Sequence, residues 1–439
     1  MRLIALLFSL LVYASTFAQT ESEVEYVPES RFENKNQTYE DDIHSMSLTR
    51  MGNTSTLPYI RLRGNERLTL RFDDFSNRQD DINYRIVHCE SNWETSNIPF
   101  RYYARGIEEG FLLNYQYSRT LNQSFVTYSL EIPNDDIQLT QSGNYVIYIY
   151  RNGKINKPIL SHRFYVTEDQ VEIEMDIHRA FDPMYRDKKQ ELDFSISHEK
   201  YPIINPDQSL KVVLLQNQRW DNAITDLKPL FIEGSKLTYN YDGENTFWAG
   251  NEYRYFDIRN TNIRSENVDG FVKRIDTTHI FLDKAEPKKS HNAMDGPNNL
   301  YGGYQIGSSM GFDNTFTDTD YAQVYFYINA EYENPNGKYY AFGGFTNFEH
   351  NEKYRYTYNE EKKRYELQVY LKQGLYNWHH HFVRNGNHVG ELKQMEGNYA
   401  ITNNQYTLLV YHRPFGQDFD RLIKVAVYTF PNPSSENND

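Results

Sequence analysis

The chain has a single cysteine, Cys89, among its 439 residues. It therefore cannot form an internal disulfide, and its stability must come from packed cores rather than from covalent cross-links. Because Cys89 ends the strand-like run 82–89, we expect it to be a small buried hydrophobic residue. It also lies far from the N-terminus, so the acylatable cysteine that follows a lipoprotein leader is missing and we expect no direct lipid anchor.

Long apolar runs are missing after the first eighteen residues. Met1-Arg2 gives a short positive start, residues 3–17 are mainly apolar, and Thr16-Phe17-Ala18 places small residues where a signal peptidase reads them. We predict a signal peptide over 1–18, with cleavage before Gln19 and export of the chain. No later run of 18 apolar residues could hold the chain in a bilayer as a helix.

Positively charged residues are fewer than negatively charged ones, with 46 Lys and Arg compared with 60 Asp and Glu. The formal net charge is −14, and it becomes −15 when Arg2 is removed with the signal peptide. Binding to nucleic acid needs a basic stripe, and so does docking on an anionic lipid surface. The charge therefore argues against both kinds of partner and mainly favours solubility.

Aromatic residues are abundant by contrast, at 15% of the chain, and Tyr alone accounts for 38 residues. Tyr suits half-buried strands, because its ring packs while its hydroxyl stays in water, and exposed Tyr also suits protein interfaces. Apolar and polar residues alternate in short runs such as 68–72, 82–86 and 126–132. No amphipathic helical stretch exceeds about three turns. We predict an all-β protein.

Turn and linker signals divide this strand-rich chain into three β-sandwiches. Asn152-Gly153, for example, supplies the positive φ angles of a tight hairpin turn. We predict a flexible N-terminal arm over 19–40, immunoglobulin-like sandwiches over 41–168 and 169–285, a charged linker over 286–295, a third sandwich over 296–431 and a disordered tail over 432–439.

Metal-binding motifs are weak. His379 and His381 would share one face of a strand and His380 the other, but a zinc site needs a third ligand that no sequence motif supplies. Asp318-Thr319-Asp320 hints at calcium but lacks the EF-hand spacing.

Motifs for catalysis are weak as well. The paired acids flank turns, where carboxylates are usually solvated rather than aimed at one cleft. These pairs are Asp73-Asp74, Asp80-Asp81, Asp135-Asp136 and Glu360-Glu361. Gly307-Ser308-Ser309-Met310-Gly311 does not match the Gly-x-Ser-x-Gly nucleophile elbow. His88 and Cys89 are strand neighbours that point to opposite faces, so they do not form a dyad. We predict no enzyme activity, no catalytic, cofactor-binding or metal-binding residues, and no cofactor.

The segment 339–383 resembles the immunoglobulin-like fold of starch-binding and glycogen-binding modules. The resemblance rests on Phe342-Gly343-Gly344-Phe345-Thr346-Asn347-Phe348 and on Gly374-Leu375-Tyr376-Asn377-Trp378. In those modules, exposed Trp or Tyr rings stack on sugars. The resemblance implies the same fold for the third sandwich. It leaves one alternative function open, which is a glycan-binding module or an accessory protein of polysaccharide utilisation.

A second resemblance covers nearly the whole chain. It is carried by His88-Cys89-Glu90-Ser91-Asn92-Trp93-Glu94-Thr95-Ser96, by residues 118–128, by Ile132-Pro133-Asn134, by Ser142-Gly143-Asn144-Tyr145 and by residues 406–422. These segments resemble a family of secreted Bacteroidota proteins that includes the plug protein of the type IX secretion system. Where the family often has Asn-Ala-Asp-Trp after the cysteine, this chain has Glu90-Ser91-Asn92-Trp93.

The resemblance implies a periplasmic protein that associates peripherally with the outer membrane. In this family the protein binds and occludes the periplasmic opening of the very large type IX translocon barrel, and we expect one copy per complex. Occlusion requires a rigid, soluble body and no catalytic group. We interpret the motif residues as strand ends and turns rather than as barrel contacts. These residues are His88, Trp93, Asn122, Pro133-Asn134 and Arg413-Pro414-Phe415.

Overall fold

The computed structural model describes residues 34–50, 54–120, 123–291, 293–294, 296–309 and 315–431. The predicted signal peptide and tail, and residues 19–33 of the predicted arm, lie outside these ranges. The described residues are mostly strands, and their helical turns are α1 (Phe100–Tyr103), α2 (Pro206–Ser209), η1 (Gly344–Thr346) and η2 (Glu352–Tyr354). The all-β prediction is confirmed. Within these residues no helix has both the length and the apolar character to cross a membrane.

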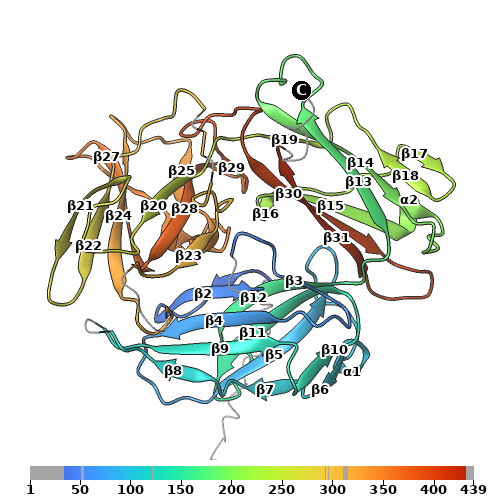
Figure 1. Cartoon of the computed structure of the whole chain (residues 1–439), viewed down its shortest axis with the longest axis horizontal. Coiled ribbons are helices and arrows are strands. Elements are labelled where there is room, and N and C mark those ends of the chain that lie inside the picture. Colours follow the sequence, from blue (N-terminus) through green and yellow to red (C-terminus); the bar gives the residue numbers. More distant parts are fainter. Residues whose placement is uncertain are drawn as a thin grey trace, which may run out of the picture. The chain divides into compact units, whose positions relative to one another are not determined.

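The first sheet pair consists of two main sheets that share one apolar core between residues 37 and 167 (Figure 1). One sheet runs in the order β1 (Gln37–Thr38), β12 (Pro158–Thr167), β11 (Gly143–Arg151), β5 (Ile82–Cys89) and β7 (Glu109–Phe111), with β3 (Tyr59–Arg61) parallel to β12. The other runs β2 (Ile43–Thr49), β4 (Leu68–Asp74), β9 (Val126–Ile132) and β8 (Tyr115–Tyr117). A small ladder joins β6 (Ala104–Gly106) to β10 (Ile137–Leu139).

The predicted period of two decides which side chains fill this core. Leu68, Leu70 and Phe72 of β4 are all buried, as the alternation requires. The turn between β11 and β12 has positive φ at both Asn152 and Gly153, which confirms the predicted hairpin.

The second sheet pair surrounds a core that brings together residues from 171 to 430. One sheet runs β13 (Glu172–Arg179), β14 (Lys189–Ser197), β18 (Lys236–Tyr239) and β17 (Phe231–Glu233), with β19 (Thr246–Trp248) also on β14. The other runs β16 (Arg219–Ile224), β15 (Leu210–Gln216), β30 (Asn404–His412) and β31 (Arg421–Phe430).

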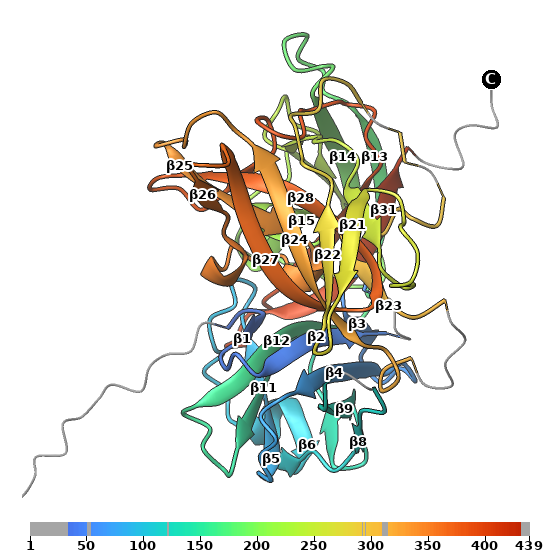
Figure 2. The ribbon, with the colours of Figure 1, turned by 90° about the vertical axis from the view of Figure 1, so that its left-hand side faces the viewer.

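The third sheet pair has β28 (Gly374–Arg384) as the shared partner of one sheet. This strand pairs with β20 (Arg254–Asp257), β23 (Tyr304–Ile306), β25 (Gly337–Phe342) and β29 (Gly390–Glu391). The other sheet runs β21 (Val268–Lys273), β22 (Thr278–Leu282), β24 (Tyr321–Asn329), β27 (Arg364–Lys372) and β26 (Thr357–Asn359). Figure 2 shows β21, β22, β24 and β27 side by side.

The sheets do not follow the predicted boundaries of the second and third sandwiches. Strands β20, β21 and β22 fall inside the predicted segment 169–285 but pair with strands of the third sheet pair. Strands β30 and β31 fall inside 296–431 but complete the second pair, because Tyr406, Leu408 and Val410 pack into its core. The chain thus leaves the second sheet pair, builds the third and returns, so a single cut at 285 separates strands from their cores.

Two segments predicted to be loose are attached to the sheets. Within the predicted arm 19–40, Gln37 and Thr38 form β1 and pair with β12. Within the predicted linker 286–295, the Lys288 N–H donates to the carbonyl oxygen of Met395, and the Lys288 side chain is nearly buried beside Glu396. Polar composition suggested loops at both places, but backbone pairing and buried charge hold these residues in place.

Candidate functional site

The histidine run lies in the middle of β28, and all three rings are buried. His379 stacks on Tyr253 and His381 on Phe342, whereas His380 bonds to the hydroxyl of Tyr356 through Nδ1 at 2.8 Å. The predicted alternation therefore holds. Burial lowers the pKa of His379 to about 3 and the pKa values of His380 and His381 well below the usual value, so all three rings are neutral at pH 7.

His381 is joined by two residues that sequence analysis did not connect with it. His350 Nε2 lies 2.9 Å from His381 Nδ1, and Asp221 of β16 completes a cluster whose ligand-type atoms lie within 4.8 Å of one another. Arg219 holds the Asp221 carboxylate through Nε at 2.9 Å and Nη2 at 2.7 Å. No sequence signal identifies this cluster, because its members are 31 to 160 residues apart.

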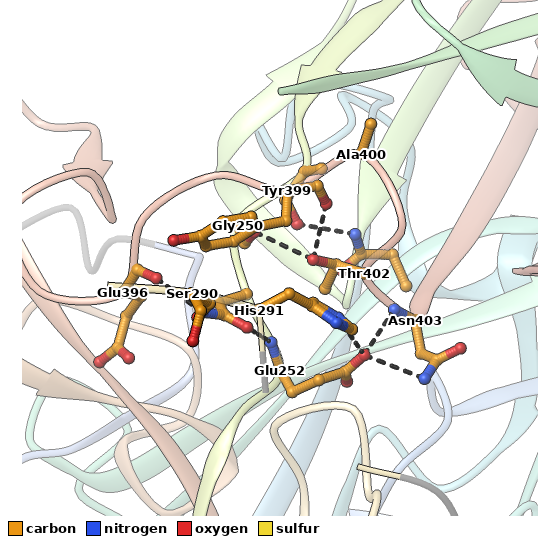
Figure 3. A network of polar contacts seen from close by, with 12 residues as sticks. Gly250, Glu252, Ser290, His291, Glu396, Tyr399, Ala400, Thr402 and Asn403 are labelled. Carbon is orange, nitrogen blue, oxygen red and sulfur yellow. Dashed lines mark hydrogen bonds and ion pairs between the residues drawn. The ribbon is translucent and has the colours of Figure 1, made fainter. Parts of the chain in front are cut away.

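A buried polar network holds together the two places where the chain crosses between the second and third sheet pairs (Figure 3). Glu252 lies where the chain leaves the second sheet pair, between β19 and β20, and Asn403 lies where the chain returns, just before β30. Glu252 accepts hydrogen bonds from the backbone N–H and side chain of Asn403, at 2.8 and 2.9 Å, and lies 3.3 Å from His291 Nε2. The Thr402 hydroxyl donates to the carbonyl oxygen of Gly250 at 3.0 Å. The outgoing and returning segments are thus bonded directly to each other.

Glu396 is fully buried in the same region. Arg254 Nε lies 3.0 Å from one carboxylate oxygen of Glu396, and Lys288 Nζ lies 3.3 Å from the other. Burial alone would raise the pKa of Glu396, but these two cations hold it well below the usual value. Glu396 therefore carries a structural negative charge that ties 254, 288 and 396 together.

A second buried ion pair joins the first and third sheet pairs. Lys372 Nζ of β27 lies 2.6 Å from Asp73 Oδ2 of β4, and both side chains are almost completely buried. Asp73 also accepts hydrogen bonds from the hydroxyls of Thr127, at 2.6 Å, and Tyr321, at 2.5 Å. The prediction that Asp73-Asp74 is a solvated turn pair is therefore wrong, since Asp74 is buried too and pairs with Arg151 at 2.9 Å.

A third polar cluster joins the first and second sheet pairs around Asp420. The carboxylate accepts hydrogen bonds from Ser91, through its N–H at 3.1 Å and its hydroxyl at 2.7 Å. Arg413 Nε lies 2.9 Å and Lys211 Nζ 3.0 Å from the same carboxylate, and Glu90 pairs with Arg413 at 2.5 Å. The family-like motifs at 88–96 and 413–415 thus meet at one junction, which sequence alone did not show.

The other residues singled out in the sequence either make structural contacts or lie apart from these clusters. His88 bonds to Ser96 at 2.8 Å and to the carbonyl oxygen of Ser142 at 3.1 Å. Cys89 is buried as predicted, and burial raises the pKa of its thiol to about 12, which disfavours a reactive thiolate. Asp318 is held by Arg119 through two hydrogen bonds of 2.9 Å.

The other acids and the serine segment do not converge on one site. Asp80 pairs with Arg151, whereas Asp135-Asp136 and Glu360-Glu361 are exposed. In the Gly307-Ser308-Ser309-Met310-Gly311 segment, Met310 and Gly311 lie outside the described residues, as does Asn122 of the family-like motifs.

The aromatic residues of segment 339–383 do not form an exposed face around Trp378. This side chain is only 5% exposed and packs against Phe256 and Phe326 in the core of the third sheet pair. Phe348 is half-buried. Trp378 is therefore a core residue and is not available to stack on a sugar.

Some of the large exposed apolar side chains gather along one stretch of the first sheet pair, whereas others, such as Leu230, Phe231 and Ile232, lie elsewhere. The gathered side chains lie in or beside β6, β7 and β8, and β7 and β8 are edge strands of the two main sheets. We refer to this set as the β6–β8 segment; its members are Tyr102, Ile107, Phe111, Leu113, Tyr115 and Tyr117. Exposed apolar residues on short edge strands are typical of protein contact sites.

Comparison with known proteins connects these features to a family. Residues 43–168 match the family model described as "Type 9 secretion system plug protein 1st domain". No curated protein matches. The crystal structure of a hypothetical protein from Parabacteroides merdae is 30% identical, covers 90% of this chain and 99% of its own, and superposes with a TM-score of 0.86.

A DNA glycosylase from Pseudomonas fluorescens, 11% identical over 28% of this chain and 30% of its own, has a TM-score of 0.16, which is too low to indicate a shared fold. The matched range includes the segments 88–96, 118–128, 132–134 and 142–145 that carried the resemblance in the sequence, whereas residues 406–422 lie outside it. The chain belongs to the type IX secretion system plug protein family.

Proposed function

We propose that this protein is a non-catalytic periplasmic plug, which binds the type IX translocon barrel in the outer membrane and occludes its periplasmic opening. The observation that carries the proposal is the family match over residues 43–168. Export by the signal peptide at 1–18, peripheral attachment through the barrel and one copy per complex belong to the same proposal. We also infer that the three sheet pairs are β-sandwiches, the first two of immunoglobulin type.

The contacts between the sheet pairs support this role, because a plug must not deform under the load of a large pore. Asp73–Lys372 joins the first and third pairs, the Asp420 cluster joins the first and second, and the Glu252 network joins the second and third. Breaking a buried ion pair by removing one partner is strongly unfavourable. Relative motion of the sheet pairs would break such contacts, so we expect a stiff body.

The β6–β8 segment is the surface that we propose for barrel contact. It lies within the residues that match the plug-domain family, and its exposed rings and aliphatic side chains would be covered on binding. Aromatic residues at the centre of an interface contribute most of the binding energy in typical complexes. The strands β7 and β8 also lie at sheet edges, the kind of place where a partner can add a strand.

The decisive experiment is deletion of the gene in its own bacterium, followed by measurement of uptake of large hydrophilic probes. If the protein occludes the translocon, the deletion strain becomes permeable and the wild-type gene restores the barrier. Unchanged permeability in the deletion strain would contradict the proposal.

Co-purification with the barrel tests the proposed contact surface. We expect Leu113→Glu combined with Tyr117→Glu to lower recovery of the complex by about 10-fold or more, since each charge would be buried at an apolar contact. Phe181→Glu is the matched control, because Phe181 is 80% exposed, as is Leu113, but lies in the second sheet pair. Equal loss in the control would locate the contact elsewhere.

A further inference from the structure

Three ligand-type side chains converge from separate parts of the chain. Asp221 lies on β16, His381 on β28, and His350 between η1 and η2. One potential ligand atom of each lies within 4.8 Å of the others, and His350 Nε2 and His381 Nδ1 are 2.9 Å apart. We propose that Asp221, His350 and His381 bind a divalent transition-metal ion such as Zn²⁺, with His381 as the member of the histidine run that takes part.

The donor set fits this class of ion. Two imidazoles and one carboxylate suit Zn²⁺ and neighbouring transition metals better than Ca²⁺ or Mg²⁺, which prefer oxygen ligands. Ligands must be deprotonated to bind. Burial keeps both imidazoles neutral by lowering the pKa of His350 to about 4 and that of His381 well below its usual value. Arg219 outweighs the effect of burial on Asp221 and lowers its pKa, so the carboxylate is ionised.

Arg219 and Gly390 orient the carboxylate and also limit the strength of the site. Asp221 accepts two hydrogen bonds from Arg219 and one from the Gly390 N–H at 3.0 Å. A carboxylate offers about four lone-pair positions, which leaves one for an ion. The guanidinium charge opposes a second cation nearby. We therefore expect weaker binding than at a four-ligand structural zinc site.

Gly390 provides an independent observation that points to the same place. A Cβ atom at this position would lie 2.2 Å from His381 Nδ1 and 2.6 Å from His350 Nε2. Gly390 is not among the glycines with positive φ, so its backbone conformation does not demand glycine. Glycine is required at position 390 because there is no space for a side chain, which would cover the two nitrogen atoms of His350 and His381.

The test uses the full-length mature protein, treated with chelator, dialysed and titrated with Co²⁺ and then with Zn²⁺. We expect one saturable ion per chain, with a visible Co²⁺ absorption band that Zn²⁺ displaces. His350→Gln and Asp221→Asn should each weaken binding by at least about 10-fold, and Gly390→Ala should abolish it. His388→Gln is the matched control, since His388 is an exposed histidine nearby and should have no effect.

The alternative is that His350 and His381 form only a neutral hydrogen-bonded pair beside the Arg219–Asp221 ion pair. Failure of the wild-type protein to bind Co²⁺ saturably would overturn the proposal. Equal binding by wild type and His350→Gln would overturn it as well, because the ion would then bind adventitiously at another place. Each variant is first checked by urea unfolding without metal. In addition, Zn²⁺ should raise the unfolding temperature of the wild type but not that of His350→Gln.

Discussion

At the scale of single residues, three buried carboxylates lie where separate parts of the chain meet. Asp73, Glu396 and Asp420 are each almost fully buried, and each carboxylate meets a cation from another part of the chain. Such pairs are costly to break, because the remaining charge is left in a poorly solvated place. They therefore specify one arrangement of the elements around them.

Removal of Lys372 tests this reasoning. Burial lowers the pKa of Lys372, and Asp73 opposes that effect. We expect Lys372→Met to lower the free energy of unfolding by about 3–5 kcal/mol, measured in urea. Lys338→Met, which removes a half-exposed lysine 3.9 Å from Glu352, should cost less than about 1 kcal/mol. The double variant Lys372→Met/Asp73→Leu should recover part of the loss, and equal losses at 372 and 338 would contradict the prediction.

Asp420 should make stability depend on pH in the acid range. Burial alone would raise its pKa, but hydrogen bonds from Ser91 and Arg413 and the charge of Lys211 lower it from 3.8 to about 2. Because the folded pKa is the lower one, the stabilisation is present above about pH 4 and is lost as the pH falls from about 4 to about 2.

We therefore expect Asp420→Asn to lower the free energy of unfolding by about 2 kcal/mol at pH 7, and the difference from wild type to shrink between pH 4 and pH 2. Urea unfolding at several pH values measures both effects. Asp135→Asn, at an exposed position, serves as the control. A difference from wild type that is constant down to pH 2 would show that the carboxylate charge is not responsible.

At the scale of elements, strand identity followed from local pattern, but strand partnership did not. The alternation at 68–72, 82–86 and 126–132 correctly marked β4, β5 and β9. Alternation indicates which face of a strand is apolar, but it does not indicate which sheet will cover that face. Consequently β30 was expected in the third sandwich, over 296–431, whereas it pairs with β15 of the second sheet pair.

This discontinuity predicts which fragments fold. A fragment of residues 169–285 lacks β30 and β31 and carries β20–β22 without their core, so we expect no cooperative unfolding. A chimera of 169–250 joined by a short Gly/Ser linker to 399–431 contains every strand of the second sheet pair and should unfold cooperatively in urea. Trp220 and Trp248 are present in both proteins, so their fluorescence reports on unfolding in each.

The same chimera with Leu408→Asp is the control, because it places a charge in the core and should not fold. Cooperative unfolding of the 169–285 fragment would show instead that the C-terminal strands are dispensable.

At the scale of the whole molecule, the proposed function separates binding from occlusion. In that proposal, binding depends on the exposed β6–β8 segment, whereas occlusion depends on the polar junctions that hold the sheet pairs together. Loosening the junctions should therefore leave attachment to the barrel intact while it weakens the seal.

We predict this outcome for the combined variant Asp73→Ala/Asp420→Ala. It should co-purify with the barrel as well as wild type does, yet cells that produce it should admit large hydrophilic probes. Probe uptake and recovery of the complex are measured in the same strains, with Asp135→Ala/Glu360→Ala as a charge-matched exposed control. A wild-type barrier in the double variant would show that stiffness at these junctions is not needed for the seal.

The all-β class, many of the strands, the burial of Cys89 and the family could all be read from the amino-acid sequence, because each depends on local periodicity, composition or short motifs. The folded structure was needed to learn which strands share a core, that Asp73 meets Lys372, and that Asp221 and His350 lie beside His381. These residues are 31 to 299 positions apart in the chain. Their meeting depends on packing between sheets, which no local pattern encodes.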